Sequence, residues 1–215
     1  MHNIYQRHSM ALVLMLFVLQ LFAQGPNNSG TYYKAANGQK GKALKTALCS
    51  IIYTPKDLGY NGLFAAYTKT DKRADGKVWD MYSDCSWTFG SDQCGSYSSE
   101  CDCYNREHSI PKSWFGGSTS GPGCDIFHLV PTDGKVNGMR SNYAFGEVSS
   151  ASYTYDGAKK GSAKSITIIG GNTIAGNTGT TISCSGTVFE PRDEYKGDFA
   201  RGYMGSLLKW AGDQS

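Results

Sequence analysis

The sequence predicts an α+β fold in which helices and a few short strands are joined by long loops. Three stretches space their apolar residues along one face of a helix: residues 42–53, 58–71 and 193–210. Short strands are expected over residues 77–83, over 124–131 and within the threonine- and isoleucine-rich segment 164–188. Between these elements the chain is rich in Gly, Ser and Asp, which indicates loops.

Local signals set the limits of several elements. Pro55 ends the first helix, because proline cannot donate the backbone hydrogen bond that a helix interior needs. Pro131 is expected to end the second strand. Thr132 or Asp133 is a candidate N-cap for a further helix within residues 132–142. The aromatic residues of the last helix recur every four positions, which is more typical of a core face than of a ligand site.

The start of the chain is typical of an exported protein. An apolar run from Met10 to Phe22 follows Arg7 and is too short for a membrane span with a stop-transfer pattern. We therefore interpret residues 1–23 as a signal peptide and the glycine-, asparagine- and serine-rich residues 24–38 as a flexible segment. The alternative is a single membrane-anchor helix. Export predicts a secreted or periplasmic protein.

The cysteines agree with export, because disulfides form in oxidising compartments. All seven follow the apolar run: Cys49, Cys85, Cys94, Cys101, Cys103, Cys124 and Cys184. Seven is odd, so at least one thiol stays outside intrachain disulfides. One or two disulfides are expected within residues 85–124, with Cys94–Cys103 as the first candidate.

The overall charge does not indicate a partner. Removal of residues 1–23 takes away one arginine and no acid, which lowers the formal net charge from +3 to +2. A nearly neutral chain does not by itself argue for nucleic-acid binding. Any basic surface must therefore be local.

Two polar segments carry the residues suited to catalysis. Outside the signal the chain has two histidines, His108 and His128, and His108 directly follows Glu107. A carboxylate and an amide oxygen, such as those of Glu107 and Asn137, are hard ligands that suit Mg²⁺. A histidine beside the ion could take a proton from water, because its usual pKa lies near neutrality.

One geometric difficulty attends this pairing. Successive side chains of a strand point to opposite faces, so Glu107 and His108 can share a site only where the strand ends or bulges. Pro111, three residues after His108, makes a strand end plausible at this point.

Three motifs together resemble the bacterial endonuclease I family of secreted and periplasmic nucleases. They are "YNREHSIPKSWF" (104–115), "DIFHLVPTDGKVNGMRSN" (125–142) and "FEPRDEYKGDFAR" (189–201). The resemblance extends from about residue 43 to residue 204. It implies a ββα-metal (His-Me finger) core surrounded by helices and loops, within one domain at residues 39–215. It also implies that the loop after the Glu-His pair lets both side chains point into the site.

The resemblance assigns a role to each candidate residue. It makes His108 the general base, and Glu107 and Asn137 the ligands of Mg²⁺, which Ca²⁺ or Mn²⁺ could replace. The expected phosphate ligands are Arg106, Lys112 and Arg140, and the expected structural supports are Asp125, His128 and Asn142. Relatives carry an arginine in the loop between the strands, whereas residues 109–124 contain none. Relatives also continue beyond the last helix, so the chain looks C-terminally shortened.

Three functional hypotheses follow. The first is a secreted, metal-dependent and monomeric endonuclease that cuts DNA, and RNA as a second substrate, with little sequence preference and no membrane contact after signal cleavage. The second is a binding or surface protein that keeps the nuclease fold but has impaired catalysis. The third is a disulfide-rich adhesion module, which leaves the motifs unexplained. The intact Glu107, His108 and Asn137 favour the first.

Overall fold

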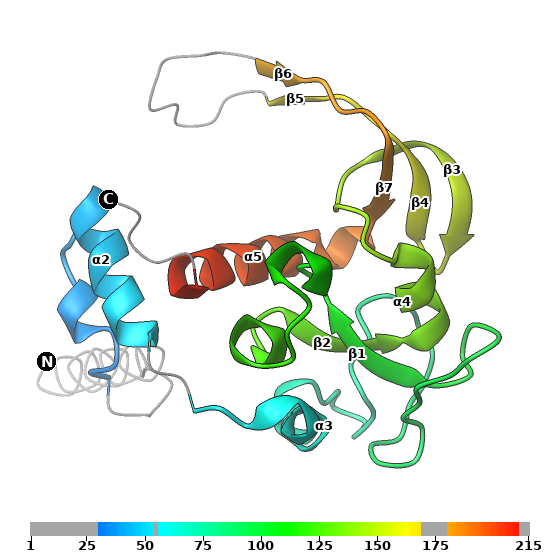
Figure 1. Cartoon of the computed structure of the whole chain (residues 1–215), viewed down its shortest axis with the longest axis horizontal. Coiled ribbons are helices and arrows are strands. Elements are labelled where there is room, and N and C mark those ends of the chain that lie inside the picture. The colour runs from blue at the N-terminus through cyan, green and yellow to red at the C-terminus, as the bar shows by residue number, and fades with distance from the viewer. Residues whose placement is uncertain (1–29, 54–55, 169–179, 211–215) are drawn as a thin grey trace, which may run out of the picture. The chain divides into compact units, whose positions relative to one another are not determined.

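The computed structural model describes residues 30–53, 56–168 and 180–210 (Figure 1). The chain divides into two compact units, one of Met1–Pro55 with Leu208–Ser215 and the other of Lys56–Leu207. The signal peptide predicted over residues 1–23 lies outside the described residues. Within the described ranges, no helix has the length and apolar character needed to cross a bilayer.

The smaller unit contains a 3-10 turn, η1 (Lys34–Ala36), and the helix α2 (Gly41–Ile52). The helix predicted over residues 42–53 is therefore confirmed. The thiol of Cys49 on α2 donates to the Leu208 carbonyl, 3.0 Å away. The predicted flexible segment 24–38 is described only from residue 30, where it includes η1.

The larger unit contains the remaining elements. Its helices and 3-10 turns are α3 (Gly59–Thr70), η2 (Lys112–Phe115), η3 (Gly121–Cys124), α4 (Gly134–Arg140), η4 (Asp193–Tyr195) and α5 (Lys196–Trp210), whose last residues belong to the smaller unit. Its strands are β1 (Tyr104–His108), β2 (Leu129–Asp133), β3 (Val148–Tyr155), β4 (Ala158–Ala163), β5 (Ile166–Ile168), β6 (Thr180–Ile182) and β7 (Thr187–Glu190). This mixture confirms the predicted α+β class.

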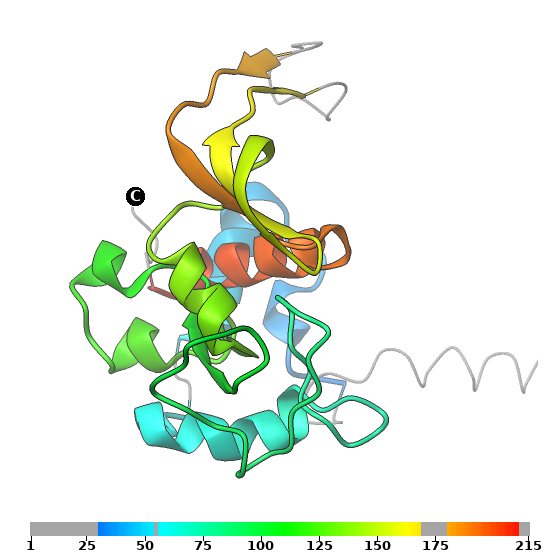
Figure 2. The same cartoon turned by 90° about the vertical axis from the view of Figure 1, so that its right-hand side faces the viewer.

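A strand–strand–helix succession forms the centre of the larger unit. The strands β1 and β2 pair antiparallel, with Glu107 opposite Val130 and His108 opposite Leu129. The helix α4 follows β2 without a loop, and both views show the strand pair between α3 and α4 (Figures 1 and 2). The two strands thus present one face to each helix.

The sequence around α4 explains why this short helix begins and packs where it does. Asp133 is its N-cap, and Oδ1 accepts the N–H of Val136 at 3.0 Å, which confirms one of the two predicted caps. Tyr97 lies against the helix where Gly134 and Gly138 carry no side chain. A Cβ on Gly138 would approach the Tyr97 hydroxyl oxygen to 2.2 Å. The glycine spacing therefore lets the cysteine-rich loop pack on α4.

The sequence pattern does not predict most strands of the second sheet. The sheet has the order β3-β4-β7, with all neighbours antiparallel, and β5 pairs with β6 separately. β3 is largely exposed and β4 reads "AKKGSA", so neither shows apolar alternation. They form strands because their backbones pair closely with each other. A Cβ on Gly161 would lie 2.0 Å from the Ser150 carbonyl oxygen. The predicted segment 164–188 does contain β5 and β6.

Among its described residues, the larger unit contains three apolar clusters. One joins α4, β2, β4, β7 and α5 through six buried residues: Tyr82, Val130, Val136, Ala158, Phe189 and Phe199. Another lies between the cysteine-rich loop and β1, and the third packs α3 on β2. Phe199 confirms that the aromatic stripe of the last helix faces the core, although Leu207 at its end is 60% exposed.

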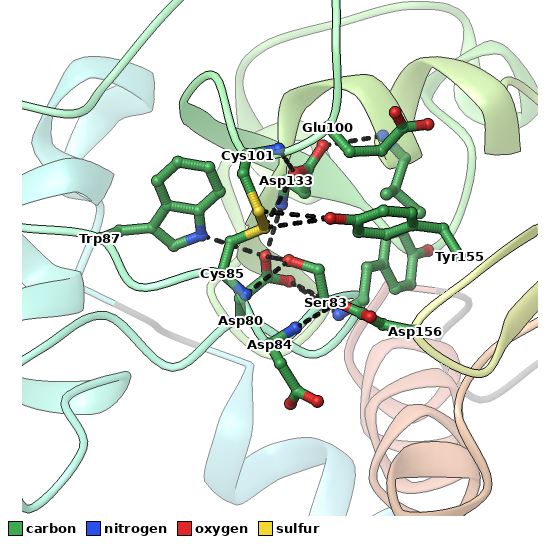
Figure 3. Close-up of a disulfide and its surroundings, with 12 residues drawn as sticks. Asp80, Ser83, Asp84, Cys85, Trp87, Glu100, Cys101, Asp133, Tyr155 and Asp156 are labelled. Atoms are coloured by element: carbon green, nitrogen blue, oxygen red, sulfur yellow. Dashed lines mark hydrogen bonds between the residues drawn. A yellow bond between two sulfur atoms is a disulfide. The ribbon is translucent and has the colours of Figure 1, made fainter.

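Two disulfides close the loop that precedes β1. Cys94–Cys103 is present as predicted, and Cys85–Cys101 is a second bridge. Figure 3 shows the second bridge beside Asp133, whose Oδ2 accepts the N–H of Cys101 at 2.6 Å. Asp133 in turn donates its own N–H to Asp80. The bridge therefore lies directly against the N-cap of α4.

Two strand predictions were wrong in their extent. Residues 77–83 form no strand apart from a single bridge at Val78, because Asp80 accepts the N–H groups of Tyr82 and Ser83 and turns the chain. The strand predicted over 124–131 instead spans Leu129–Asp133. Pro131 lies inside it, which a two-stranded sheet tolerates because each strand has one edge without a partner.

Glu190, at the buried end of β7, should make the free energy of unfolding depend on pH. Burial acts to raise the pKa of Glu190, but hydrogen bonds from Lys196, Val148 and Lys159 outweigh it and lower the pKa to about 2. A lowered pKa stabilises the fold above the usual value of 4.5, and this contribution is lost as pH falls toward 2. Glu190→Gln should therefore lower the free energy of unfolding more at pH 6 than at pH 3, as measured by urea denaturation. Glu147→Gln, which removes a more exposed partner of Lys196, is the control. An equal loss at both pH values would contradict this origin.

The Cys94–Cys103 bridge should contribute measurably to stability. Replacing both cysteines by serine should lower the free energy of unfolding by about 2–4 kcal/mol, because the unfolded chain gains freedom. Cys49→Ser, which removes a cysteine outside both bridges, is the control. A double variant as stable as that control would show that the bridge adds nothing.

Candidate active site

The side chains of β1 alternate between two faces, and this separates Glu107 from His108. The side chains of Asn105 and Glu107 contact α4, where they meet Asn137 and Arg140. His108 points to the opposite face, where its ring stacks on Tyr60 of α3. The expectation that both members of the Glu-His pair point into one pocket is wrong for this structure. Regular strand geometry continues to the last residue of β1, and the chain bends only afterwards.

Glu107 is a buried carboxylate with one cationic partner. Its side chain is 2% exposed, and Oε1 accepts from the Tyr82 hydroxyl at 2.8 Å and from Arg140 Nη1 at 2.5 Å. Burial raises its pKa, while Arg140 and Tyr82 offset part of that rise. Among the described residues both bonds end on Oε1, so Oε2 is the oxygen left for a further ligand.

Arg140 holds the end of β1 to α4. It is 1% exposed. Besides Glu107 it donates to the carbonyls of His108 and Ser109, and its Nε donates to the Tyr143 carbonyl at 3.1 Å. These bonds engage most of its donors with protein oxygens. The predicted role as a phosphate ligand therefore does not fit its position in this structure, where it acts as a buried clamp.

Asn137 lies on the same side of β1 as Glu107. Its Nδ2 donates to Asn105 Oδ1 at 2.7 Å and more weakly to the Arg106 carbonyl at 3.4 Å. This orientation reserves the side-chain oxygen for a different partner. Asn137 and Arg140 are three residues apart on α4, so they share a helix face. A carboxylate and an amide oxygen thus line the interface between β1 and α4.

His108 is half-buried and uncharged at neutral pH. Burial lowers its pKa to about 4, the hydrogen bond to Gly123 opposes that shift, and the neighbouring His128 and Lys112 add to it. Nε2 lies 3.1 Å from the Gly123 carbonyl oxygen, which can only accept, so Nε2 carries the proton. Nδ1 of the neutral ring therefore holds the lone pair that could accept a proton.

Cationic side chains surround His108. Arg106 stacks on the Tyr60 ring, with 3.7 Å from Cζ to the ring centroid, and donates to the Tyr60 carbonyl. Lys112 begins η2 beside the histidine and forms no ion pair with a described residue. His128 is buried, and its Nε2 donates to the Pro122 carbonyl at 2.6 Å. This face of β1 is thus basic, as a phosphate-binding surface would be.

The other predicted supports differ in their positions. Asp125 is buried in the turn before β2, where Oδ1 accepts the N–H of Phe127 at 3.2 Å. Asn142 is exposed after the end of α4, and its supporting role stays a prediction. In the parts of the chain that the structure describes, one group of metal-type donors lies close together, Cys85, Cys101 and Asp133. Its two sulfurs form a disulfide and offer no thiolate.

Comparison with known proteins decides the family. The sequence pattern of the family described as Endonuclease I matches residues 40–207, which is most of the chain. The chain belongs to the endonuclease I family. It is 34% identical over 185 residues to an extracellular ribonuclease of Bacillus amyloliquefaciens, covering 85% of this chain and 54% of that protein. It is 31% identical over 189 residues to an extracellular ribonuclease of Bacillus subtilis strain 168, covering 86% and 56%. The chain thus spans about half the length of these relatives. No solved structure matches it.

The structure shows two tertiary contacts at the candidate site that the sequence motifs did not indicate. Tyr82 bonds to Glu107 from 25 residues away, and Tyr60 stacks on His108 from 48 residues away, with ring centroids 5.8 Å apart. Neither tyrosine lies in a segment with a polar motif. Such long-range contacts have no local sequence pattern, so only the folded chain identifies them.

Loss of the Arg140 clamp should destabilise this endonuclease I family member strongly. Arg140→Met leaves Glu107 buried without its cation, and breaking one side of a buried ion pair typically costs about 3–5 kcal/mol. Denaturant unfolding measures the change, and Lys135→Met on the same helix is the control. Combining Arg140→Met with Glu107→Gln should cost less than the two changes summed. Similar stabilities of Arg140→Met and Lys135→Met would refute the clamp.

Proposed function

We propose that this protein is a secreted, metal-dependent nuclease that hydrolyses phosphodiester bonds, with β1, β2 and α4 as a ββα-metal core. The observation that carries the proposal is His108, a neutral histidine at the end of β1 with Nδ1 available and basic residues around it. The family match and the names of its relatives support action on nucleic acid outside the cell. Residues 1–23 would direct export and be removed in the mature protein.

The chemistry assigned to His108 is general base catalysis. Nδ1 accepts a proton from the attacking water, while the Gly123 carbonyl holds Nε2–H and fixes the ring. Stacking on Tyr60 restricts the ring further. Lys112 and Arg106 attract the phosphate and stabilise the negative charge that develops on its oxygens. Lys112 replaces the arginine that relatives carry in the loop between the strands and that residues 109–124 lack.

Glu107 and Asn137 are the residues that would hold a divalent cation. Their oxygen donors suit Mg²⁺, Mn²⁺ or Ca²⁺. Glu107 also fits electrostatically, because burial raises the pKa of its carboxyl group although Arg140 and Tyr82 act to lower it, and a cation would favour the charged form. When bound, such an ion would stabilise charge on the phosphate oxygens and the leaving group. The burial of Glu107 and its pairing with Arg140 favour the alternative, a fold with impaired catalysis, and this makes the metal test informative.

The substrate proposal covers both RNA and DNA. The relatives are named ribonucleases, while the family is named for an endonuclease, and phosphate contacts alone do not distinguish sequences. The direct test incubates the protein with plasmid DNA and with total RNA, in Mg²⁺, Mn²⁺, Ca²⁺ or EDTA. Cleavage that EDTA abolishes supports the proposal. Intact substrates under every condition would leave the impaired binding protein as the better hypothesis.

Substitution at His108 tests the base. His108→Ala should lower the cleavage rate by about 10²–10⁴-fold, because it removes the proton acceptor, while the affinity for Mg²⁺ stays nearly constant. Initial rates over a magnesium titration measure both quantities. His128→Ala is the comparison, since His128 is placed to support the fold. Restoration of the His108→Ala rate by excess magnesium would make His108 a ligand instead of the base.

Substitution at Glu107 should give the opposite pattern. Glu107→Ala removes the charged ligand, so the magnesium concentration needed for half-maximal rate should rise strongly and excess metal should recover part of the rate. Asn137→Ala should show a milder form of the same effect. Equal circular dichroism spectra must be confirmed first, because both side chains also hold β1 to α4.

A further inference from the structure

An aromatic groove is lined by Trp114 of η2, the turn that also contacts His108 through Phe115. It encloses about 510 Å³, within the usual size range of small-molecule sites. Its walls come from four places in the larger unit: Trp114 of η2, the segment 144–147 after α4, Pro191 after β7, and α5 from Lys196 to Met204. All of its lining residues belong to residues 56–207, so the groove is formed within one compact unit.

Two large apolar side chains of the groove are exposed to solvent. Trp114 is 53% exposed and Met204 is 65% exposed at its rim. Inside, Phe145 and Tyr203 lie with ring centroids 5.6 Å apart. In the wall, Lys196 pairs with Glu147 at 2.8 Å and also with Glu190 and Asp193, which engages its three N–H donors and leaves the half-exposed Glu147 carboxylate as an acceptor. Flat rings with a few polar groups at one edge suit a planar heterocycle, because ring faces stack and the heterocycle edge forms hydrogen bonds.

Two contacts connect the groove with the candidate active site. The Tyr203 hydroxyl donates to the carbonyl of Ser109, the residue after His108, at 2.5 Å. The Phe145 ring lies under the guanidinium of Arg140, 4.7 Å from its Cζ to the centroid, and Arg140 holds Glu107. The groove is therefore built on the same side chains that fix the end of β1.

The turn η2 contributes residues both to the groove and to the surroundings of His108. Its first residue, Lys112, is the proposed phosphate ligand, and Trp114 two residues later lines the groove. Phe115 of the same turn packs near the His108 ring, with centroids 6.3 Å apart. A nucleotide offers the matching pair of groups, a phosphate and a base. The four residues of η2 thus include one side chain for the phosphate, Lys112, and one for the base, Trp114.

We propose that the groove binds one unstacked nucleobase next to the phosphate being cleaved, so that the preferred substrate is single-stranded. This inference rests on the proposed action on nucleic acid. A base in a duplex is paired and stacked and has no free face, whereas a base in a single strand can leave the stack and lie on Trp114. Trp114 supplies the stacking surface, and the Glu147 carboxylate offers an acceptor to the edge of the base.

The test combines a change in the protein with a change in the ligand. Fluorescence anisotropy measures the affinity for a short single-stranded oligonucleotide, in the His108→Ala protein with magnesium and in the otherwise unchanged protein with EDTA. One nucleotide at a time is replaced by an abasic nucleotide. Trp114→Ala removes the proposed platform, and Trp79→Ala, which removes a tryptophan 44% exposed outside the groove, is the control.

We expect one abasic position to weaken binding by about 5- to 150-fold, the equivalent of about 1–3 kcal/mol of stacking on an aromatic side chain. Trp114→Ala should weaken binding of the intact strand by a similar factor and make the protein insensitive to that abasic position. Duplex affinity should not change.

The inference is overturned if Trp114→Ala binds single strands as Trp79→Ala does, or if single strands and duplex lose affinity equally. It is also overturned if Trp114→Ala leaves oligonucleotide affinity intact and instead abolishes self-association, measured by sedimentation, because the groove would then hold a second copy of the chain. Cleavage is measured separately on each protein. Base binding through Trp114 without any cleavage would reject the proposed hydrolysis while supporting the base site.

Discussion

The geometry of the candidate site depends on one buried guanidinium. Arg140 joins the last turn of α4 to the side chain of Glu107 and to the carbonyls of the two residues that follow it. Removing so many polar groups from water is costly unless each finds a partner, and the fixed fork of the guanidinium satisfies several at once. The end of β1 and the helix are thereby held in one register. The orientation of His108 follows from that register.

The opposite end of α4 is fixed by a separate network. Asp133 caps the helix with one carboxylate oxygen and accepts the Cys101 N–H with the other. Asp80 receives the Asp133 N–H and the Trp87 indole, and so ties the cap to the loop before β1 (Figure 3). Cys85–Cys101 closes that loop. A helix of seven residues is too short to be stable alone, so both ends require such tertiary support.

The two faces of β1 carry different kinds of functional group. On the face toward α4 lie oxygen donors suited to a hard cation, and on the face toward α3 lies a neutral histidine among basic and aromatic groups. Because strand geometry keeps these sets apart, a phosphate that uses both must lie beyond the end of the strand, where the chain turns after Ser109. The aromatic groove reaches the same carbonyl of Ser109 from the side of α5. This one strand end is thus the point where the proposed metal ligands, base and nucleobase site converge.

The sequence by itself determined the elements that have a strong local signal. It predicted α2, α3 and α5 from helical periodicity, Asp133 as one of two candidate caps, and Cys94–Cys103 as the first candidate disulfide. Its three polar motifs were enough to predict the family. These features depend on residues close together in the chain, where propensity and pattern act directly.

Tertiary structure alone decided the rest. β3 and β4 have little apolar alternation and exist because they pair with β7, and residues 77–83 turn because buried Asp80 collects nearby N–H groups. Arg140 looks like a phosphate ligand in the sequence, yet burial makes it a clamp. Tyr60, Tyr82 and Trp114 have no motif around them. Their roles come from contacts between distant segments, which hydrophobic burial and the need to satisfy buried polar groups select only when the whole chain packs.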